Sequence, residues 1–155
     1  MSEIIKNKLY LGNLFDVNNS HFIKDNNITC IICVAEGLKI KNENDNIKIY
    51  KYDLQDDYNC DISLYLHEIV KIINMEKVVL VNCVAGISRS STFVIAYLIK
   101  YFNISLKKAF LYVKSKRNQI CPNKKFMESL IEYELKILGK NSLTYDECIN
   151  LFYYT

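Results

Sequence analysis

The sequence predicts an α/β protein with a single mixed, mostly parallel β-sheet flanked by helices. Short apolar runs typical of strands alternate with helical stretches in the first half of the chain, and the second half is helical. The 155 residues, half of them hydrophobic and with few prolines and glycines, suit one compact domain with one core.

Four segments have the composition expected of β-strands: residues 8–12, 28–34, 47–52 and 77–82. The last of these is apolar almost throughout, as in a strand that is buried on both faces. Between the strands, we expect a polar helical stretch at 16–25 and a charged, Asn-rich loop at 37–46.

Helical spacing of apolar residues predicts four longer helices: 62–75, 89–102, 106–117 and 124–138. The residues expected to cap their N-termini are Asp61, Ser105 and Asn123, and Gly139 is expected to end the last of them. A short final helix begins at the capping-box pattern of residues 144–147. Tyr145, Cys148, Ile149 and Phe152 share one of its faces, so we expect it to dock on its own domain rather than to form a dimer contact or a mobile tail.

Composition and charge exclude several classes of protein. The formal net charge of +3 is too small to indicate a nucleic-acid partner. No stretch reaches the roughly 18 apolar residues that cross a bilayer, and the first residues do not resemble a signal peptide. We therefore expect a cytoplasmic protein that could also enter the nucleus, with reduced cysteines and no membrane partner. Because the sequence begins close to its first predicted strand, with no arm to exchange, we expect a monomer.

A zinc site is the alternative use for the cysteines. Cys30 and Cys33 have the spacing of a metal-binding pair, but there is no second pair, and the only histidines are His21 and His67. Residues three apart on a strand lie on opposite faces and cannot bind one ion. We interpret both cysteines as core residues and expect no metal and no cofactor.

The most informative stretch is 78–91, which runs from an apolar strand through a short loop into an apolar helix. Glycine at position 86 lets successive amides turn inward around one point, and the helix N-terminus behind them adds positive potential. Such a loop binds a phosphate dianion and favours a thiolate at Cys83, which would be a nucleophile. Arg89 can hold two phosphoryl oxygens with its planar fork. The hydroxyls of Ser88 and Ser90 can donate to the thiolate or to the loop.

The stretch Cys-Val-Ala-Gly-Ile-Ser-Arg-Ser at 83–90 resembles the phosphate-binding loop of dual-specificity protein phosphatases, which belong to the cysteine-based protein tyrosine phosphatase superfamily. The resemblance covers about residues 4–138. Its other matching positions are 9–13, 28–36, Arg117, 121–123, Phe126, Leu130, Tyr133 and Glu134. It implies a catalytic domain at 1–140, followed by an extension at 141–155.

The resemblance also implies an activity and a set of site residues. The family hydrolyses phosphoproteins through a cysteinyl-phosphate intermediate, with an aspartic acid protonating the leaving oxygen. Counting back five residues from the expected cap Asp61 gives Asp56 as this acid, with Asp57 as the alternative and Asp53 less favoured. The implied phosphate-binding loop consists of Cys83, Val84, Ala85, Gly86, Ile87, Ser88 and Arg89, with Ser90 as a further catalytic residue.

Other positions are assigned more ordinary roles. Asn123 is interpreted first as a helix cap, and Arg117 as a structural or surface-recognition residue rather than a catalytic one. The short chain lacks long segments that would deepen the pocket, so a shallow site that admits phosphotyrosine, phosphoserine and phosphothreonine is expected.

The sequence departs from the family pattern at Asn82, where the family has a histidine that supports the loop. Asparagine can form hydrogen bonds but cannot carry charge, so we expect Asn82 to support the loop with weaker activation of Cys83. Two alternatives to a protein phosphatase stay open. One is a catalytically weak phosphoprotein-binding pseudophosphatase. The other is a phosphatase for a non-protein phosphate ester, although the loop lacks the extra lysines typical of such relatives.

Overall fold

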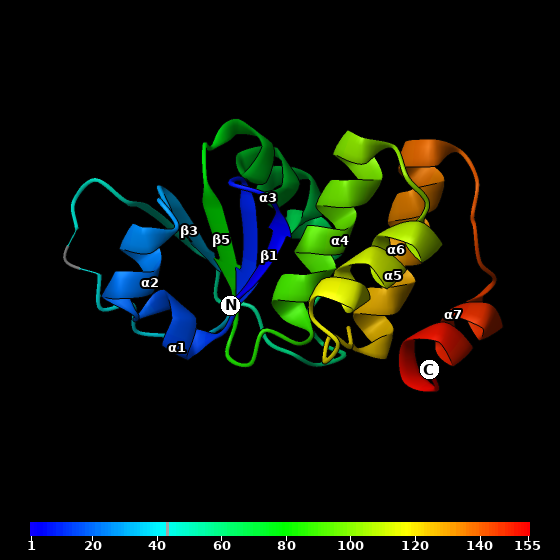
Figure 1. Ribbon diagram of the computed structural model, residues 1–155. Coiled ribbons are helices and arrows are strands. Elements are labelled where there is room, and N and C mark those ends of the chain that lie inside the picture. Colours follow the sequence, from blue (N-terminus) through cyan, green and yellow to red (C-terminus); the bar gives the residue numbers. More distant parts are fainter. Residues whose placement is uncertain (43) are drawn as a thin grey trace.

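The computed structural model describes residues 1–42 and 44–155 and contains a five-stranded sheet with helices on both faces (Figure 1). Residue 43, in the predicted loop 37–46, lies outside the described residues. The strands are β1 (Ser2–Ile5), β2 (Leu9–Gly12), β3 (Cys30–Cys33), β4 (Lys48–Lys51) and β5 (Val79–Asn82). The helices are α1 (Leu14–Val17), α2 (Ser20–Asp25), α3 (Ser63–Met75), α4 (Arg89–Phe102), α5 (Leu106–Lys116), α6 (Lys124–Leu138) and α7 (Tyr145–Tyr153).

The sheet is mixed and mostly parallel, so the predicted fold class is confirmed. Its strand order is β1-β2-β5-β3-β4, and only β1 runs antiparallel to its neighbour. Strand β5 lies in the centre, with Asn82 opposite Gly12 of β2 on one side and Cys33 of β3 on the other. Open α/β sheets bind ligands outside the carboxyl ends of their parallel strands, and the segment after β5 emerges at the middle of that edge.

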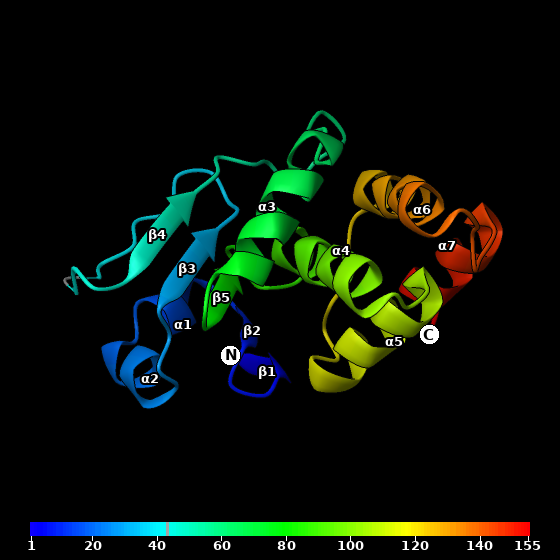
Figure 2. The ribbon, with the colours of Figure 1, turned by 90° about the horizontal axis from the view of Figure 1, so that it is seen from above.

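Two hydrophobic clusters cover the two faces of the sheet. On one face, α3 and α4 lie against the strands, and α5 to α7 are arranged beyond α4 (Figure 2). On the other face, α1 and α2 cover a smaller cluster that includes Val17, Ile23 and Leu80. All four residues of β5 are buried, as the apolar run predicts, because both faces of the central strand are covered.

The structure corrects three details of the predicted elements. The first strand is β1, which the sequence analysis missed; it is held by pairing with β2. The stretch predicted as one helix at 16–25 consists of two short helices, because Asn19 caps a new helix with its side chain. Helix α3 is capped by Ile62 rather than Asp61, although the Asp61 carboxylate still accepts from the amide of Ser63 at 3.1 Å.

The predicted ends of the later helices are confirmed. Ser105 and Asn123 cap α5 and α6 with their side chains, and Gly139 ends α6 in the left-handed conformation. Helix α7 begins at the expected capping box of Thr144 and Glu147. Within the described residues, no helix is both long and apolar enough to cross a bilayer.

Helix α7 packs against the rest of the chain through part of its predicted apolar face. The ring of Phe152 stacks on that of Phe110 in α5, with centroids 4.0 Å apart, and Cys148 is completely buried. Tyr145, which was expected on the same face, is exposed. The helix and the segment that follows β5 both lie along the lower side of the molecule in the view of Figure 1.

Candidate active site

Residues 83–88 form a tight loop between β5 and the N-terminus of α4. Cys83 is buried, and its sulfur accepts a hydrogen bond from the amide of Gly86 at 3.2 Å, so the loop curls back over the thiol. Gly86 has a φ of 68°, and a Cβ at this position would lie 2.6 Å from the carbonyl oxygen of Gly12. Both the backbone conformation and the close approach of β2 therefore require glycine here.

The carbonyl groups of the loop are bound from outside by other parts of the chain. Val84 O accepts from the amide of Leu14 at 3.0 Å, and Ile87 O accepts from the amide of Cys121 at 3.0 Å. The carbonyls of Ala85 and Gly86 accept from Arg117. Since successive carbonyls are turned outward, the amides between them are turned inward, which is the arrangement of an anion-binding nest.

Arg117 holds this arrangement from the α5 side. Its Nε donates to Gly86 O at 2.8 Å, and its Nη2 donates to Ala85 O at 3.1 Å. A third bond, from Nη1 to Ser2 Oγ at 3.3 Å, connects the guanidinium to β1. The side chain is largely buried, so of the two roles considered from the sequence, the structure places Arg117 in the structural one.

Arg89 and Ser90 begin α4, directly after the loop, and Ser90 lies beside Cys83. Ser90 Oγ is 3.1 Å from the sulfur of Cys83, and Ser90 is completely buried. Arg89 is oriented by one bond, from Nη1 to Leu54 O at 2.9 Å. Its Nε is buried and has no acceptor within the described residues. An oxyanion in the nest would supply that acceptor, because a guanidinium can bind two oxygens of one phosphoryl group.

The carboxylate of Asp56 is bonded to the loop and to the start of α6. Its Oδ1 accepts from Ser88 Oγ at 2.7 Å and from the side-chain amide of Asn123 at 2.8 Å. Ser88 Oγ in turn accepts from the backbone amide of Asn123 at 3.0 Å. The alternative, Asp57, is turned into its own loop, where its Oδ1 accepts from the amides of residues 59 and 60. Of the two carboxylates, only that of Asp56 is bonded to the phosphate-loop candidate.

Asn82 does not support the loop in the way that the sequence analysis expected, and this assignment is corrected. The side chain is completely buried, its Nδ2 donates to the sulfur of Cys33 at 3.9 Å, and its Oδ1 has no donor within the described residues. The cause is the strand register, because the parallel pairing of β3 with β5 places Cys33 directly opposite Asn82. The amide therefore faces the neighbouring strand.

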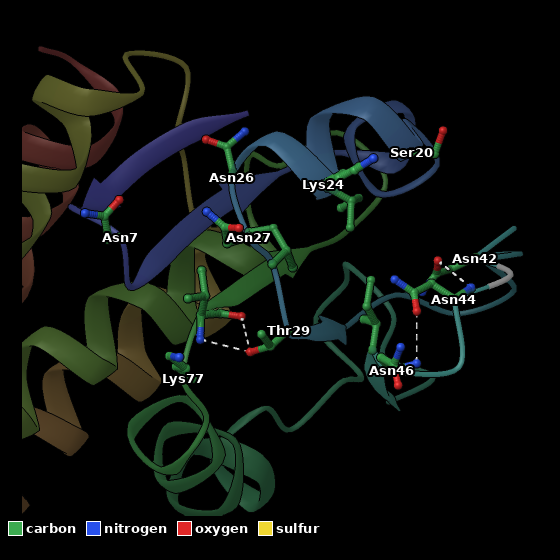
Figure 3. Close-up of a pocket in the computed structure, with 14 residues that line it drawn as sticks. Asn7, Ser20, Lys24, Asn26, Asn27, Thr29, Asn42, Asn44, Asn46 and Lys77 are labelled. Atoms are coloured by element: carbon green, nitrogen blue, oxygen red, sulfur yellow. Dashed lines mark hydrogen bonds between the residues drawn. The ribbon is translucent and has the colours of Figure 1, made fainter.

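A cavity of about 780 Å³ lies at the opposite edge of the sheet (Figure 3). Its lining includes Asn27, Thr29 and Lys77, which precede parallel strands, whereas Cys83 follows one. Two of its hydrogen bonds are made by lining residues: that from Val78 N to Thr29 Oγ1 connects the segments that precede β5 and β3, and that from Asn44 N to Asn42 Oδ1 joins residues two apart in the sequence. This cavity is therefore separate from the site around Cys83.

A sequence model described as the dual specificity phosphatase catalytic domain matches residues 9–136, which is most of the chain. The chain belongs to the dual specificity phosphatase family. Family membership supports a protein phosphatase that acts on phosphoproteins. The match includes the loop 83–89, Asp56 and Asn123, but it ends before α7.

Alignments with related proteins extend over most of the chain. Mouse dual specificity protein phosphatase 14 is 37% identical over 144 residues, spanning 90% of this chain and 72% of that protein. Dual specificity protein phosphatase 1B of Arabidopsis thaliana is 34% identical, spanning 87% and 83% of the two chains. The crystal structure of human tyrosine phosphatase-like serine/threonine/tyrosine-interacting protein superposes with a TM-score of 0.81 at 31% identity, covering 89% of this chain and 97% of that one.

One residue of this candidate site has more contacts than its sequence position predicts. Asn123 was interpreted first as a helix cap, and its Oδ1 does accept from the amide of Phe126 at 2.9 Å. Its Nδ2 and its backbone amide, however, connect Asp56 to Ser88. No local pattern distinguishes a capping asparagine with this second function from an ordinary one, because the partners are far away in the sequence.

Proposed function

We propose that the chain is an active phosphatase that hydrolyses phosphotyrosine, phosphoserine and phosphothreonine in proteins through a cysteinyl-phosphate intermediate. The observation that carries the proposal is the position of Cys83. Its sulfur accepts from an amide of a loop whose carbonyls are bound from outside, Arg89 follows this loop at the start of α4, and Asp56 is bonded to Ser88 of the loop. This arrangement supports the proposal, because a nucleophile, an anion-binding nest and a proton donor would then surround one point.

In the first step, the Cys83 thiolate attacks phosphorus while the bond from phosphorus to the substrate oxygen breaks. The amides of the loop and the Arg89 guanidinium bind the three phosphoryl oxygens, whose charge is spread over the transition state. Asp56 gives its proton to the leaving oxygen, which is a poor leaving group without it. The products of this step are the dephosphorylated hydroxyl and a phosphorylated Cys83.

In the second step, water attacks the phosphorus of the cysteinyl phosphate. The Asp56 carboxylate accepts a proton from this water, the sulfur–phosphorus bond breaks, and inorganic phosphate leaves. Ser90 Oγ, 3.1 Å from the sulfur, donates a hydrogen bond to the departing thiolate. Cys83 and Asp56 are then back in their starting protonation states.

Hydrolysis of a small aryl phosphate by the wild type, Cys83→Ser and Arg89→Lys tests the proposal. The serine variant should lose turnover, because an alcohol in this nest stays protonated, while it should still bind phosphorylated peptides. The turnover rate of the lysine variant should fall by several orders of magnitude, because the point charge of an ammonium group cannot replace the planar guanidinium of Arg89. If Cys83→Ser turns over substrate at the wild-type rate, Cys83 is not the nucleophile.

The second candidate is a phosphoprotein-binding module with weak or no catalysis. It is favoured by Asn82, which lacks the charge of the family histidine and faces Cys33 instead of the loop. A similar structure, moreover, is named as phosphatase-like and as an interacting protein. A pure binding module needs neither a thiol nor Asp56. Peptide binding by the wild type without hydrolysis of any phosphate ester at any pH would favour this candidate.

A further inference from the structure

We propose that Tyr153 of α7, beyond the part of the chain that matches the family, is a positioning residue for the acid Asp56. It acts through Pro122 and Asn123. Because Asp56 is the acid only in the proposed function, this inference rests on that function.

Successive residues of the segment after α5 form hydrogen bonds with successive residues of the phosphate loop. Arg117 binds the carbonyls of Ala85 and Gly86, the amide of Cys121 donates to Ile87 O at 3.0 Å, and the amide of Asn123 donates to Ser88 Oγ at 3.0 Å. Residues 117–123 thus form a second layer behind the loop. The position of Asn123 in this layer decides where its side chain meets Asp56.

Helix α7 holds this layer from the far side. The hydroxyl of Tyr153 donates to Pro122 O at 2.7 Å, and the thiol of Cys121 donates to Phe152 O at 3.8 Å. Pro122 is buried and lies between the two residues whose amides bind the loop. A proline has no amide hydrogen, so its carbonyl is the only backbone group with which it can be held by a hydrogen bond.

The contact is built to persist. Phe152, next to Tyr153, is anchored by its stacking on Phe110 at 4.0 Å, which fixes the end of α7 against the domain. Burial raises the pKa of the Tyr153 phenol, so the hydroxyl keeps its proton, and with it the hydrogen bond to Pro122, throughout the range in which the enzyme would work. Along the contacts from Tyr153 to Asp56, Pro122 is buried, Tyr153 and Asn123 are half-buried, and the bond from Asn123 to the carboxylate is exposed.

Tyr153→Phe tests the proposal, because it removes the hydroxyl and keeps the ring. The kcat for a phosphotyrosine peptide should fall roughly three- to tenfold, as expected for one lost hydrogen bond, whereas the kcat for an activated aryl phosphate, which needs little protonation, should change much less. Tyr112→Phe is the matched control. Its hydroxyl also donates to a backbone carbonyl, that of Ile4 at 2.6 Å, but this bond connects α5 to β1. The control should leave the ratio of the two kcat values at the wild-type level.

A double-mutant cycle separates positioning from general stability. In Asn123→Ser, the helix cap is retained but the side-chain amide that reaches Asp56 is gone. Tyr153→Phe should therefore have little additional effect on the kcat ratio in that background. Additive effects of the two substitutions, or a wild-type ratio in Tyr153→Phe, would overturn the proposal.

Amide hydrogen exchange gives a readout that does not depend on catalysis. The amides of Cys121 and Asn123 should exchange faster in Tyr153→Phe than in the wild type, and Tyr112→Phe should not share this change. If the wild type hydrolyses no ester, the proposed function fails, and the exchange rates alone decide whether Tyr153 holds this segment. Unchanged exchange at both amides would overturn the inference in that case too.

Discussion

The side-chain amide of Asn123 donates to Oδ1 of Asp56 at 2.8 Å, although 67 positions separate the two residues in the sequence. This bond joins the loop after β4 to the start of α6. Together with the bond from Ser88 to the same oxygen, it leaves the other oxygen of Asp56 without a partner within the described residues. That oxygen is the one on which a proton for the leaving group would be carried.

Asn123→Ser should therefore slow proton transfer from Asp56 to the leaving oxygen without unfolding α6. Serine keeps the cap on the amide of Phe126, so the free energy of unfolding should change by less than about 1 kcal/mol. The kcat for a phosphotyrosine peptide should fall roughly tenfold, and that for an activated aryl phosphate should fall less. Steady-state kinetics with both substrates, beside a urea titration, check this. An equal loss with the two substrates would mean that Asn123 does not act through the acid.

Gly86→Ala should be far more damaging than Gly139→Ala, although both glycines have a positive φ. At Gly139, φ is 75° and a Cβ would have no atom within 4 Å, so only the left-handed backbone is penalised, by about 1 kcal/mol. At Gly86, a Cβ would also lie 2.6 Å from Gly12 O, and β2 would have to move. We expect a loss of roughly 2–4 kcal/mol in the free energy of unfolding, together with lost turnover.

Urea unfolding of the two glycine variants, followed by circular dichroism, makes this comparison directly. Calorimetric titration with inorganic phosphate then shows whether any folded Gly86→Ala still binds the anion. Equal stability of the two variants would contradict the close approach of β2 to the loop.

Selective alkylation should distinguish Cys83 from the other thiols. Burial raises the pKa of Cys148 to about 11 and that of Cys30 to about 12, and it also raises the pKa of Cys121 and Cys60. A raised pKa keeps these groups as unreactive thiols below pH 8. Iodoacetamide at pH 7 should therefore modify Cys83 first and abolish turnover, and inorganic phosphate should protect it. Peptide mapping by mass spectrometry identifies the modified position, and first modification at Cys60 or Cys121 would contradict the assignment.

The sequence predicted best what is local. The loop 83–89 is contiguous, and the apolar strand before it and the apolar helix after it determine where it lies in the sheet. Asp56 came from the family resemblance by counting from a helix cap. The structure places the cap at Ile62 instead of Asp61, yet it still brings Asp56 to the loop.

The remaining features depend on partners that are distant in the sequence. Strand β1 exists through its pairing with β2. Whether Asn82 faces the loop or Cys33 is decided by the register between β3 and β5, which no run of residues in either strand reveals. The bond from Tyr153 to Pro122 likewise needs the packing of α7 to be known. These contacts depend on the packing and the register of elements that are distant in the sequence, so no local sequence pattern predicts them.

Asn82→His should restore part of the activation that the family histidine provides, but only if the packing around Cys33 accepts the larger ring. Asn82 is completely buried and faces Cys33, so the single substitution should cost roughly 1–3 kcal/mol through overpacking. Combining it with Cys33→Ala gives the imidazole room. Burial raises the pKa of the Cys33 thiol, and the charge of Cys83 makes a further, smaller contribution in the same direction. A cation between them should therefore favour the Cys83 thiolate.

The double variant should show a higher ratio of the rate at pH 5.5 to the rate at pH 7.5 than the wild type, by roughly three- to tenfold, because its imidazole is protonated at the lower pH. Cys33→Ala alone is the matched control and should keep the wild-type ratio. The pH–rate profiles of the three proteins with an activated aryl phosphate measure the effect, since that substrate makes the acid Asp56 less important. A folded double variant with the wild-type profile would mean that position 82 does not act on Cys83.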